Sequence, residues 1–332
     1  MTTADPKGNP HVIHPSWAAR ILIIAPLSAL YRLILWLVHF MDDALAVKVV
    51  YILIWPTMLL FRGRRMLNLS RLFFPLGWTQ QQCSDLSRKY VLHHARLVLE
   101  AVRLSDLTPA QVRQRVIFEG ERYLANALKQ GRGVLIVGNH IGNWLFSVAF
   151  LSASGYRVSA VAYDIPIRSI ESHMKSLWRK YELAITNVGR GAPAAALQAF
   201  KRNGIFLVLT DVSLRPSRGK WLQLGNTAIN VDTGPARLAL MTDAPILHLS
   251  NYRKSNSHFV ISLSPGMSRE TISRNLHPEE YLAQSWLNIL YEELMVRPEQ
   301  WWLLTLIPLR IPTTVPLFHT TEPVRAVEAP VS

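Results

Sequence analysis

The sequence predicts an α/β protein with a mostly parallel central sheet flanked by helices, preceded by apolar membrane-anchoring helices. Three observations predict this fold class. Short, continuously apolar runs such as residues 133–140 are typical of strands buried on both faces of a parallel sheet. These runs alternate with helical segments, as the connections of a parallel sheet require. Two long apolar stretches fill residues 21–61.

The composition combines a strong basic charge with few charged residues. Of 332 residues, 36 are Lys or Arg and 22 are Asp or Glu, a formal net charge of +14, yet only 17% are charged and 49% are hydrophobic. Typical soluble domains carry about 25% charged residues. The balance excludes intrinsic disorder and favours an anionic membrane lipid as partner. No nucleic-acid partner is expected, because the basic residues are spread along the chain and no recognition module is present.

The first apolar stretch covers residues 21–40 and the second covers residues 44–61. Each approaches the roughly 20 residues needed to cross a bilayer. Three interpretations stay open: one spanning or re-entrant anchor with an interfacial second helix, a helical hairpin, or two helices buried in a soluble core. Basic residues expected to face anionic headgroups on the cytoplasmic side follow the second stretch: Arg62, Arg64, Arg65 and Arg71. Candidates for the membrane interface are Trp17, Trp36, Tyr51 and Trp55.

These patterns divide the chain into four regions. We expect a flexible N-terminus over residues 1–16, membrane-anchoring helices over 17–62, an α/β domain over 63–312 and a flexible tail over 313–332. Within the domain, the expected helices cover residues 80–104, 120–129, 142–155, 170–183, 194–204 and 234–244. The expected strands cover residues 133–140, 157–163, 205–211, 245–253 and 258–265.

His140 ends the first of these strands and precedes a helix. Open α/β sheets bind their ligands at this end of the strands. The surrounding Gly-Asn-His-Ile-Gly-Asn turn is expected to expose backbone N–H groups that hold a carbonyl oxygen or a phosphate. In the alternative interpretation, His140 only caps the strand. The one cysteine, Cys83, excludes a Cys-rich zinc site, and no cluster with metal-ligand spacing is present, so no metal is expected.

The stretch GVLIVGNHIGNW, residues 133–144, resembles the first block of the lysophospholipid acyltransferase superfamily, in its lipid A late (lauroyl/myristoyl) acyltransferase branch. Further stretches resemble blocks of that branch in the same order, at residues 62–78, 209–240 and 297–302. The resemblance implies transfer of a fatty acyl group from an acyl carrier protein or coenzyme A thioester to a hydroxyl of a membrane lipid. It implies no cofactor besides that co-substrate, and a place at the bacterial inner membrane with the catalytic domain facing the cytoplasm.

In that branch the histidine is the general base, and an acid five residues later orients it. Here Leu145 occupies the place of the acid. Four explanations stay open. In the first, another carboxylate takes the place of the acid at His140, either Asp211 at the end of a predicted strand or Asp164 directly after one. Alternatively, His140 acts alone on an easier amine or thiol acceptor, the acyl-group reaction differs, or the protein is inactive and binds lipid or a partner. We take acyl transfer to a hydroxyl or amine, with His140 and Asp211 catalytic, as the prediction.

The resemblance also implies residues that bind the substrates. Arg215 and Arg218 are expected to hold a phosphate of the donor or the acceptor, unless they are solvated loop charges. Thr233 and Gly234 are expected at the acyl-donor site and Asn143 is expected to bind a substrate, or else these residues only start helices. Asp232, next to Thr233, is expected to cap a helix.

The segment after RPEQWW departs from the branch as well. It reads LLTLIPLRIP, with Arg310 as its one charge, where the branch usually has a basic tail. This departure argues against a multiply phosphorylated lipid A precursor and favours a less anionic acceptor, such as an ordinary lipid or a specialised metabolite.

Overall fold

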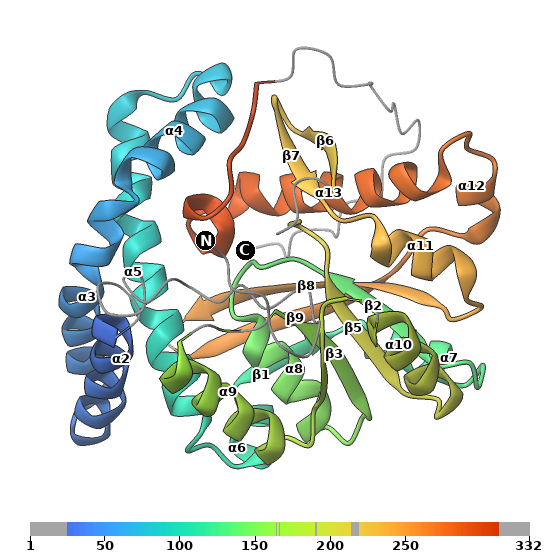
Figure 1. The fold of residues 1–332 in the computed structure, drawn as a ribbon, viewed down its shortest axis with the longest axis horizontal. Helices are drawn as coiled ribbons and strands as arrows, with labels where there is room; N and C mark the ends of the chain where they lie inside the picture. Colours follow the sequence, from blue (N-terminus) through green and yellow to red (C-terminus); the bar gives the residue numbers. More distant parts are fainter. Residues whose placement is uncertain are drawn as a thin grey trace, which may run out of the picture.

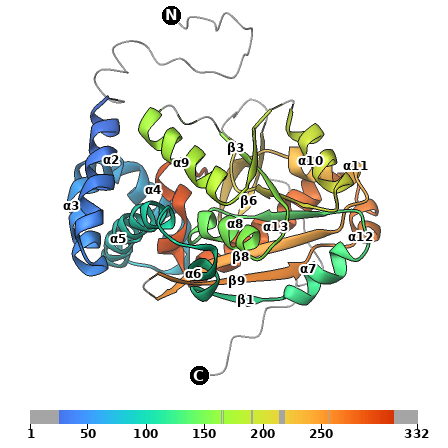
Figure 2. The ribbon, with the colours of Figure 1, turned by 90° about the horizontal axis from the view of Figure 1, so that it is seen from below.

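The computed structural model describes residues 25–163, 165, 167–189, 191–213, 219–255 and 257–311. At its centre lies a seven-stranded sheet in the order β1-β9-β8-β2-β5-β3-β4, with helices on both faces (Figures 1 and 2). Every neighbouring pair is parallel except β8 and β9, which are antiparallel. The predicted α/β class with a mostly parallel sheet is therefore confirmed.

The predicted strands and helices of the domain are all present, with boundaries shifted by a few residues. The strands are β1 Val116–Glu119, β2 Val134–Gly138, β3 Val158–Ala162, β4 Ala184–Asn187, β5 Ile205–Leu209, β6 Lys220–Leu224, β7 Thr227–Val231, β8 Ile246–Ser255 and β9 His258–Pro265. The helices are α2 Ala25–Leu37, α3 Asp43–Leu60, α4 Arg62–Phe73, α5 Gln80–Leu104, α6 Pro109–Gln114, α7 Glu121–Leu128, α8 Trp144–Ala153, α9 Arg168–Lys180, α10 Gly191–Lys201, α11 Gly234–Met241, α12 Arg269–Ser273 and α13 Pro278–Val296. Strands β6 and β7 form a separate antiparallel hairpin.

Strand β2 shows why the sheet is covered on both faces. All five of its residues are buried. Leu135 and Val137 pack into one core cluster with α10, α11 and α13. Val134 and Ile136 pack into a second cluster with α6, α7, α8 and α9. Because successive strand residues point to opposite faces, a strand between two apolar layers must be apolar at every position.

The pairing of β2 with β5 determines where the loops after them emerge. The two strands run parallel in a register that sets Gly138 beside Leu209, and each strand ends at that residue. The residues that follow, from Asn139 and from Thr210, therefore leave the sheet side by side. In open α/β sheets, ligands bind at the carboxyl edge.

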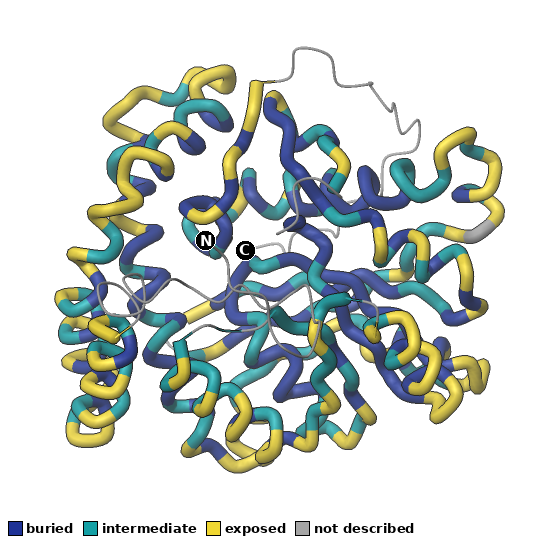
Figure 3. The backbone as a smooth tube through the Cα atoms, in the orientation of Figure 1, coloured by how far each residue is buried: buried dark blue, intermediate teal, exposed yellow. Residues whose placement is uncertain are grey.

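At one side of the molecule, helix α3 packs against α5, and helix α2 packs against α3 and α9 (Figure 1). The inner faces of α2 and α3, including Ile34 and Val50, pack with Ala95 and Leu99 of α5 in a third core cluster. Exposed positions run along α2, the turn after it and α3 (Figure 3). The large apolar side chains exposed there include Trp36, Phe40, Ile52, Trp55, Leu59 and Leu60. Within the described residues, α3 is the one helix long and apolar enough to cross a membrane. Trp17 lies outside the described residues.

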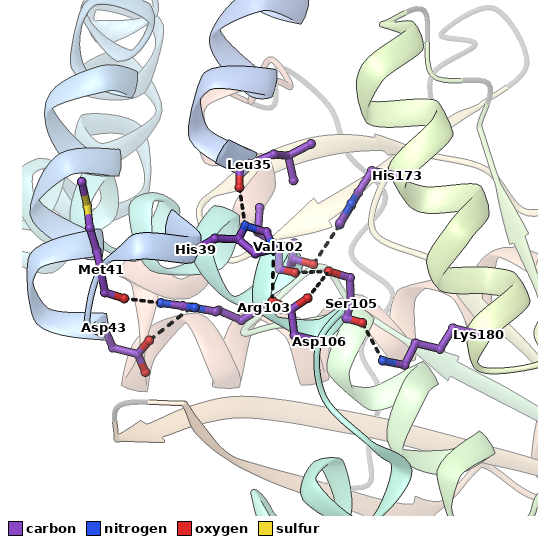
Figure 4. A network of polar contacts seen from close by, with 11 residues as sticks. Leu35, His39, Met41, Asp43, Val102, Arg103, Ser105, Asp106, His173 and Lys180 are labelled. Carbon is purple, nitrogen blue, oxygen red and sulfur yellow. Dashed lines mark hydrogen bonds and ion pairs between the residues drawn. The ribbon is translucent and has the colours of Figure 1, made fainter. Parts of the chain in front are cut away.

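The corner between α2 and α3 is tied to the domain by polar contacts (Figure 4). Arg103, near the end of α5, donates a 2.6 Å hydrogen bond to the carbonyl of Met41 and lies 3.5 Å from the carboxylate of Asp43. Lys180, at the end of α9, donates a 2.5 Å bond to the carbonyl of Ser105. The contacts of Arg103 attach the corner between α2 and α3 to the end of α5, and the bond from Lys180 attaches α9 to the same end of α5.

The expectation that all four basic residues of 62–71 face headgroups is wrong for two of them. Arg65 is buried and donates to the Ser87 hydroxyl at 2.7 Å and to the carbonyl of Met58 at 3.2 Å. Arg71 donates to the carbonyl of Leu309. The physical reason is that α4 is amphipathic and packs one face onto α5, and that face carries Arg65. Arg62 and Arg64 are exposed.

The apolar segment after residue 302 belongs to the core. Leu303, Leu304, Ile307 and Leu309 are buried in the first cluster. The Asn68 side chain donates to the carbonyls of Leu304 and Ile307 at 2.7 and 2.8 Å. Packing inside the domain explains the apolar composition of this segment, which therefore carries no information about the acceptor.

Buried His248 on β8 predicts a pH-dependent stability. Burial lowers the pKa of His248 to about 4, below its ordinary value of 6.5. The unfolded chain therefore binds a proton that the folded chain does not, and the stabilising contribution, complete above pH 6.5, is lost as the pH falls from 6.5 to 4. The shift corresponds to about 3 kcal/mol.

We expect the free energy of unfolding of His248→Leu to rise by about this amount relative to that of the parent protein as the pH falls from 6.5 to 4, because the leucine variant has no such group to protonate. Urea denaturation followed by tryptophan fluorescence measures it. Other titrating groups cancel in the comparison, so a difference that does not change with pH contradicts the prediction.

Candidate active site

The structure brings His140 and Asp211 together at the carboxyl edge of the sheet. The Nδ1 atom of His140 lies 2.6 Å from Oδ1 of Asp211, and the backbone N–H of His140 donates to Oδ2 of the same carboxylate at 2.9 Å. Asp211 is fully buried, whereas 19% of the His140 side chain is exposed. One end of the imidazole is thus fixed, while part of the side chain is exposed.

The electrostatics of the pair fix the tautomer of the imidazole. Burial alone would raise the pKa of Asp211, but the charge of His140 and the hydrogen bonds from His140 and Trp301 hold it below its ordinary value of 3.8. The carboxylate is therefore ionised at neutral pH and accepts, so the proton of a neutral imidazole lies on Nδ1. The Nε2 atom then carries the free lone pair, and no hydrogen bond to Nε2 occurs among the described residues.

Residues 298–302 hold the histidine loop from the other side. Trp301 is fully buried, and its indole Nε1–H donates to Oδ2 of Asp211 at 2.9 Å. The backbone N–H of Trp302 donates to the carbonyl of His140 at 2.9 Å, and Ile141 and Trp301 form an isolated antiparallel bridge. The RPEQWW signature is therefore part of the site. The resemblance to the family drew attention to residues 297–302, but nothing in the sequence indicated that Trp301 bonds the carboxylate of Asp211.

The expected exposed N–H groups of the Gly-Asn-His-Ile-Gly-Asn turn are in part already occupied. The N–H of His140 donates to Asp211, and the N–H of Gly142 donates to the carbonyl of Gln300 at 3.1 Å. The prediction that these donors hold a substrate oxygen is wrong for both positions, because the turn uses them to attach itself to β5 and to the 298–302 segment.

Leu145 takes no part in these polar contacts. It is half-buried and packs against the second core cluster on the face of the sheet covered by α8. Asp164, the other candidate carboxylate, lies outside the described residues. Asp211 is the carboxylate that the structure places in contact with His140.

The expected substrate-binding residues have mixed outcomes. Asn143 is only 1% exposed, with its Oδ1 accepting from the N–H of Phe146 at 3.3 Å and its Nδ2 donating to Glu100 at 3.0 Å. Both polar ends are used inside the protein and Asn143 caps α8, so its contact with a substrate stays a prediction.

Thr233 and Gly234 lie at the start of α11. The N–H of Gly234 donates to the Asp232 carboxylate at 2.8 Å, while Thr233 occupies the N-cap position of α11. Contact of Thr233 or Gly234 with an acyl donor stays a prediction. Arg215 and Arg218 lie outside the described residues.

Aromatic rings line one side of His140. The Trp144 ring is 5.0 Å from the imidazole, and the Trp302 ring is 5.6 Å from Trp144, both edge-on. Trp302 in turn stacks on His94 at 4.8 Å. Trp144 and Trp302 are half-buried, so they present an apolar wall beside the base nitrogen.

A second carboxyl group lies near the pair, and no sequence motif indicated it. Glu293 of α13 accepts from Nδ2 of Asn139, the residue before His140, at 3.3 Å. Burial, together with the charge of Asp211, raises the pKa of Glu293 to about 7, although the hydrogen bonds from Ser250 and Asn139 act in the opposite direction. Among the described residues, no three or more His, Cys, Asp and Glu side chains lie together as a metal site would require.

The fold and the site together define a class of protein. A histidine whose Nδ1 bonds a buried carboxylate, at the ligand-binding edge of an α/β sheet, is the arrangement by which enzymes obtain a general base. The chain belongs to the bacterial lipid A biosynthesis acyltransferase family, since the model of that family matches residues 13–306. Comparison with curated proteins finds no match for the chain.

The bond from Trp301 to the buried carboxylate predicts a stability effect. Trp301→Phe keeps a large ring but removes the only N–H it donates to Asp211. A hydrogen bond to a charged group contributes about 1.5–3 kcal/mol. Trp286→Phe is the control, because it replaces another buried tryptophan of the same core cluster by the same smaller ring. We expect the free energy of unfolding of Trp301→Phe to fall by about that amount more than the free energy of unfolding of Trp286→Phe. Equal losses in urea denaturation would contradict this role.

Proposed function

We propose that the protein is a membrane-associated acyltransferase that moves a fatty acyl group from a thioester donor to a hydroxyl or amine acceptor, with His140 as general base. The observation that carries the proposal is the 2.6 Å contact between Nδ1 of His140 and the buried Asp211 carboxylate. This contact occupies Nδ1, so it supports Nε2 as the nitrogen that acts as the base at the carboxyl edge of the sheet.

The reaction follows from this geometry. As the acceptor oxygen or nitrogen attacks the thioester carbonyl carbon, its proton passes to Nε2 of His140. The imidazolium formed is stabilised by Asp211, which stays ionised. The carbon–sulfur bond then breaks, and the thiol leaves with the proton from His140. The products are the acylated acceptor and the free thiol.

Asp211 accounts for the replacement of the motif acid by Leu145. The acid has two tasks, to hold the imidazole in the tautomer with a free Nε2 and to stabilise its positive charge. A carboxylate reaching Nδ1 from the neighbouring strand performs both. Leucine at position 145 removes a polar group that the histidine no longer needs.

We propose an acyl carrier protein or coenzyme A thioester as the donor, as expected for the family. The apolar wall of Trp144 and Trp302 beside His140 suits an acyl chain whose carbonyl lies at the base. Arg215 and Arg218 remain our candidates for contact with a phosphate of either substrate.

The membrane part of the proposal rests on the N-terminal helices. Apolar side chains cover the outer surface of α2 and α3, and Arg62 and Arg64 follow directly after α3. Apolar surface bordered by arginine is typical of protein next to anionic lipid. We place the α/β domain on the cytoplasmic side of the bacterial inner membrane.

The activity is tested with the purified full chain in detergent, given labelled acyl carrier protein and acyl-CoA donors and lipid, hydroxyl and amine acceptors. We expect His140→Ala to abolish transfer. Loss of the orienting carboxylate lowers the rate of serine proteases by about 10⁴-fold, and we expect Asp211→Asn to lower kcat by a comparable factor. Leu145→Met is the matched control, with a rate near that of the parent protein.

Two results would contradict the proposal. If the parent protein and His140→Ala are equally inert with every donor and acceptor, the protein is an inactive lipid-binding or partner-supporting relative. If Asp211→Asn retains the parental rate, the carboxylate does not serve His140.

A further inference from the structure

A buried ion pair lies behind the histidine loop, outside the reacting groups. Arg253 of β8 and Glu100 of α5 are both almost fully buried. The guanidinium meets the carboxylate through two bonds, Nε to Oε1 at 2.6 Å and Nη2 to Oε2 at 2.5 Å. This two-bond geometry fixes the relative orientation of both side chains, which a single contact does not.

Two routes connect this pair to the loop that carries His140. In the first, Glu100 accepts from the side chain of Asn143 at 3.0 Å. In the second, the Gln300 side chain accepts from the N–H of Arg253 at 2.8 Å and donates to its carbonyl at 3.2 Å, while the Gln300 carbonyl accepts from the N–H of Gly142. The routes end on adjacent residues, two and three positions after His140.

The loop also touches β8 directly at Gly142. This residue has a φ of +65°, and a Cβ added there would lie 2.4 Å from Oδ1 of Asn251 and 2.8 Å from its carbonyl oxygen. The loop backbone therefore sits against the strand that carries Arg253. A shift of Arg253 or of β8 would therefore also move the 139–143 loop, which carries His140.

His93 completes the surroundings of the guanidinium. Its Nδ1 lies 2.6 Å from Nη1 of Arg253. Burial and the charge of Arg253 lower the pKa of His93 well below its ordinary value, so it is neutral. A neutral ring that accepts at Nδ1 adds a third bond to Arg253 without a second positive charge, and the unit of Glu100, Arg253 and His93 has no net charge.

Stability alone gives no reason for a buried ion pair here. Well-packed apolar residues often replace such pairs with no loss of stability, because taking both charges out of water is costly. Apolar side chains do not form the directional hydrogen bonds that fix the orientation of a neighbouring loop. Glu100 bonds Asn143 directly, and the backbone of Arg253 is linked to Gly142 through Gln300, so the pair lies at both attachments of the histidine loop.

We propose that Glu100 and Arg253 are positioning residues for acyl transfer, holding the 139–143 loop so that His140 meets Asp211 in the productive geometry. The inference rests on the proposed function, since it assigns these residues to the same reaction. Their contribution is to the catalytic step, with little effect on binding of either substrate.

The test uses Arg253→Lys, which keeps the charge but loses the two-bond geometry, and the double variant Glu100→Leu/Arg253→Met, which replaces the pair by apolar side chains. We expect both to remain folded and to lower kcat about 10²-fold, the loss expected of a misplacement near 1 Å, with KM close to the parental value. Leu124→Ala, in the second core cluster, is the control for lost stability without a contact to the loop.

Hydrogen exchange of the backbone of residues 139–144 provides a readout independent of activity. We expect faster exchange there in Arg253→Lys and the double variant, and parental exchange there in Leu124→Ala. A folded double variant with parental kcat, or unchanged exchange in the loop, overturns the positioning role. If exchange rises in both variants while the parent protein itself transfers no acyl group, Glu100 and Arg253 hold the loop in place, and it is the proposed function that fails.

Discussion

The hydrogen bond between His140 and Asp211 is the interaction on which the candidate site depends. It exists because β2 and β5 are adjacent, parallel and end in the same register, so that Asn139 and Thr210 begin neighbouring loops. The bond then decides the chemistry, because an ionised carboxylate at Nδ1 leaves Nε2 as the free base. The parallel pairing of β2 and β5 thus brings the carboxylate of Asp211 to His140, whereas position 145 holds a leucine.

The C-terminal part of the domain completes this arrangement. Trp301 bonds the carboxylate, Trp302 the carbonyl of His140, and Gln300 the N–H of Gly142. Segments far apart in the chain, residues 139–142, Asp211 and residues 300–302, therefore meet at one short loop. The same reasoning explains the apolar residues after Trp302, which pack into the core and keep the 298–302 segment in place.

The fold followed from the sequence to a large extent, and the site in part. Continuous apolar runs predicted β2 and β5, because burial on both faces dictates that pattern. Asp211 was a candidate because it ends the strand predicted over residues 205–211, two residues beyond the end of β5. The sequence did not show that Arg65 and Asn143 are buried, since polar side chains are buried only where distant groups satisfy them. For the same reason Glu100 and Arg253, separated by 153 positions, carried no local signal. Short strands β1 and β4 lack the length that periodicity needs.

The state of the His140 imidazole tests the central claim most directly. Long-range ¹H–¹⁵N NMR of histidine-labelled protein reports which ring nitrogen carries the proton, and His140→Ala identifies the signal among eleven histidines. The structure predicts the Nδ1–H tautomer at neutral pH, with a strongly downfield Nδ1 proton that disappears in Asp211→Asn and persists in Leu145→Met. An Nε2–H tautomer in the parent protein, or an Nδ1 proton unaffected by Asp211→Asn, would contradict the claim that Asp211 prepares His140 as the base.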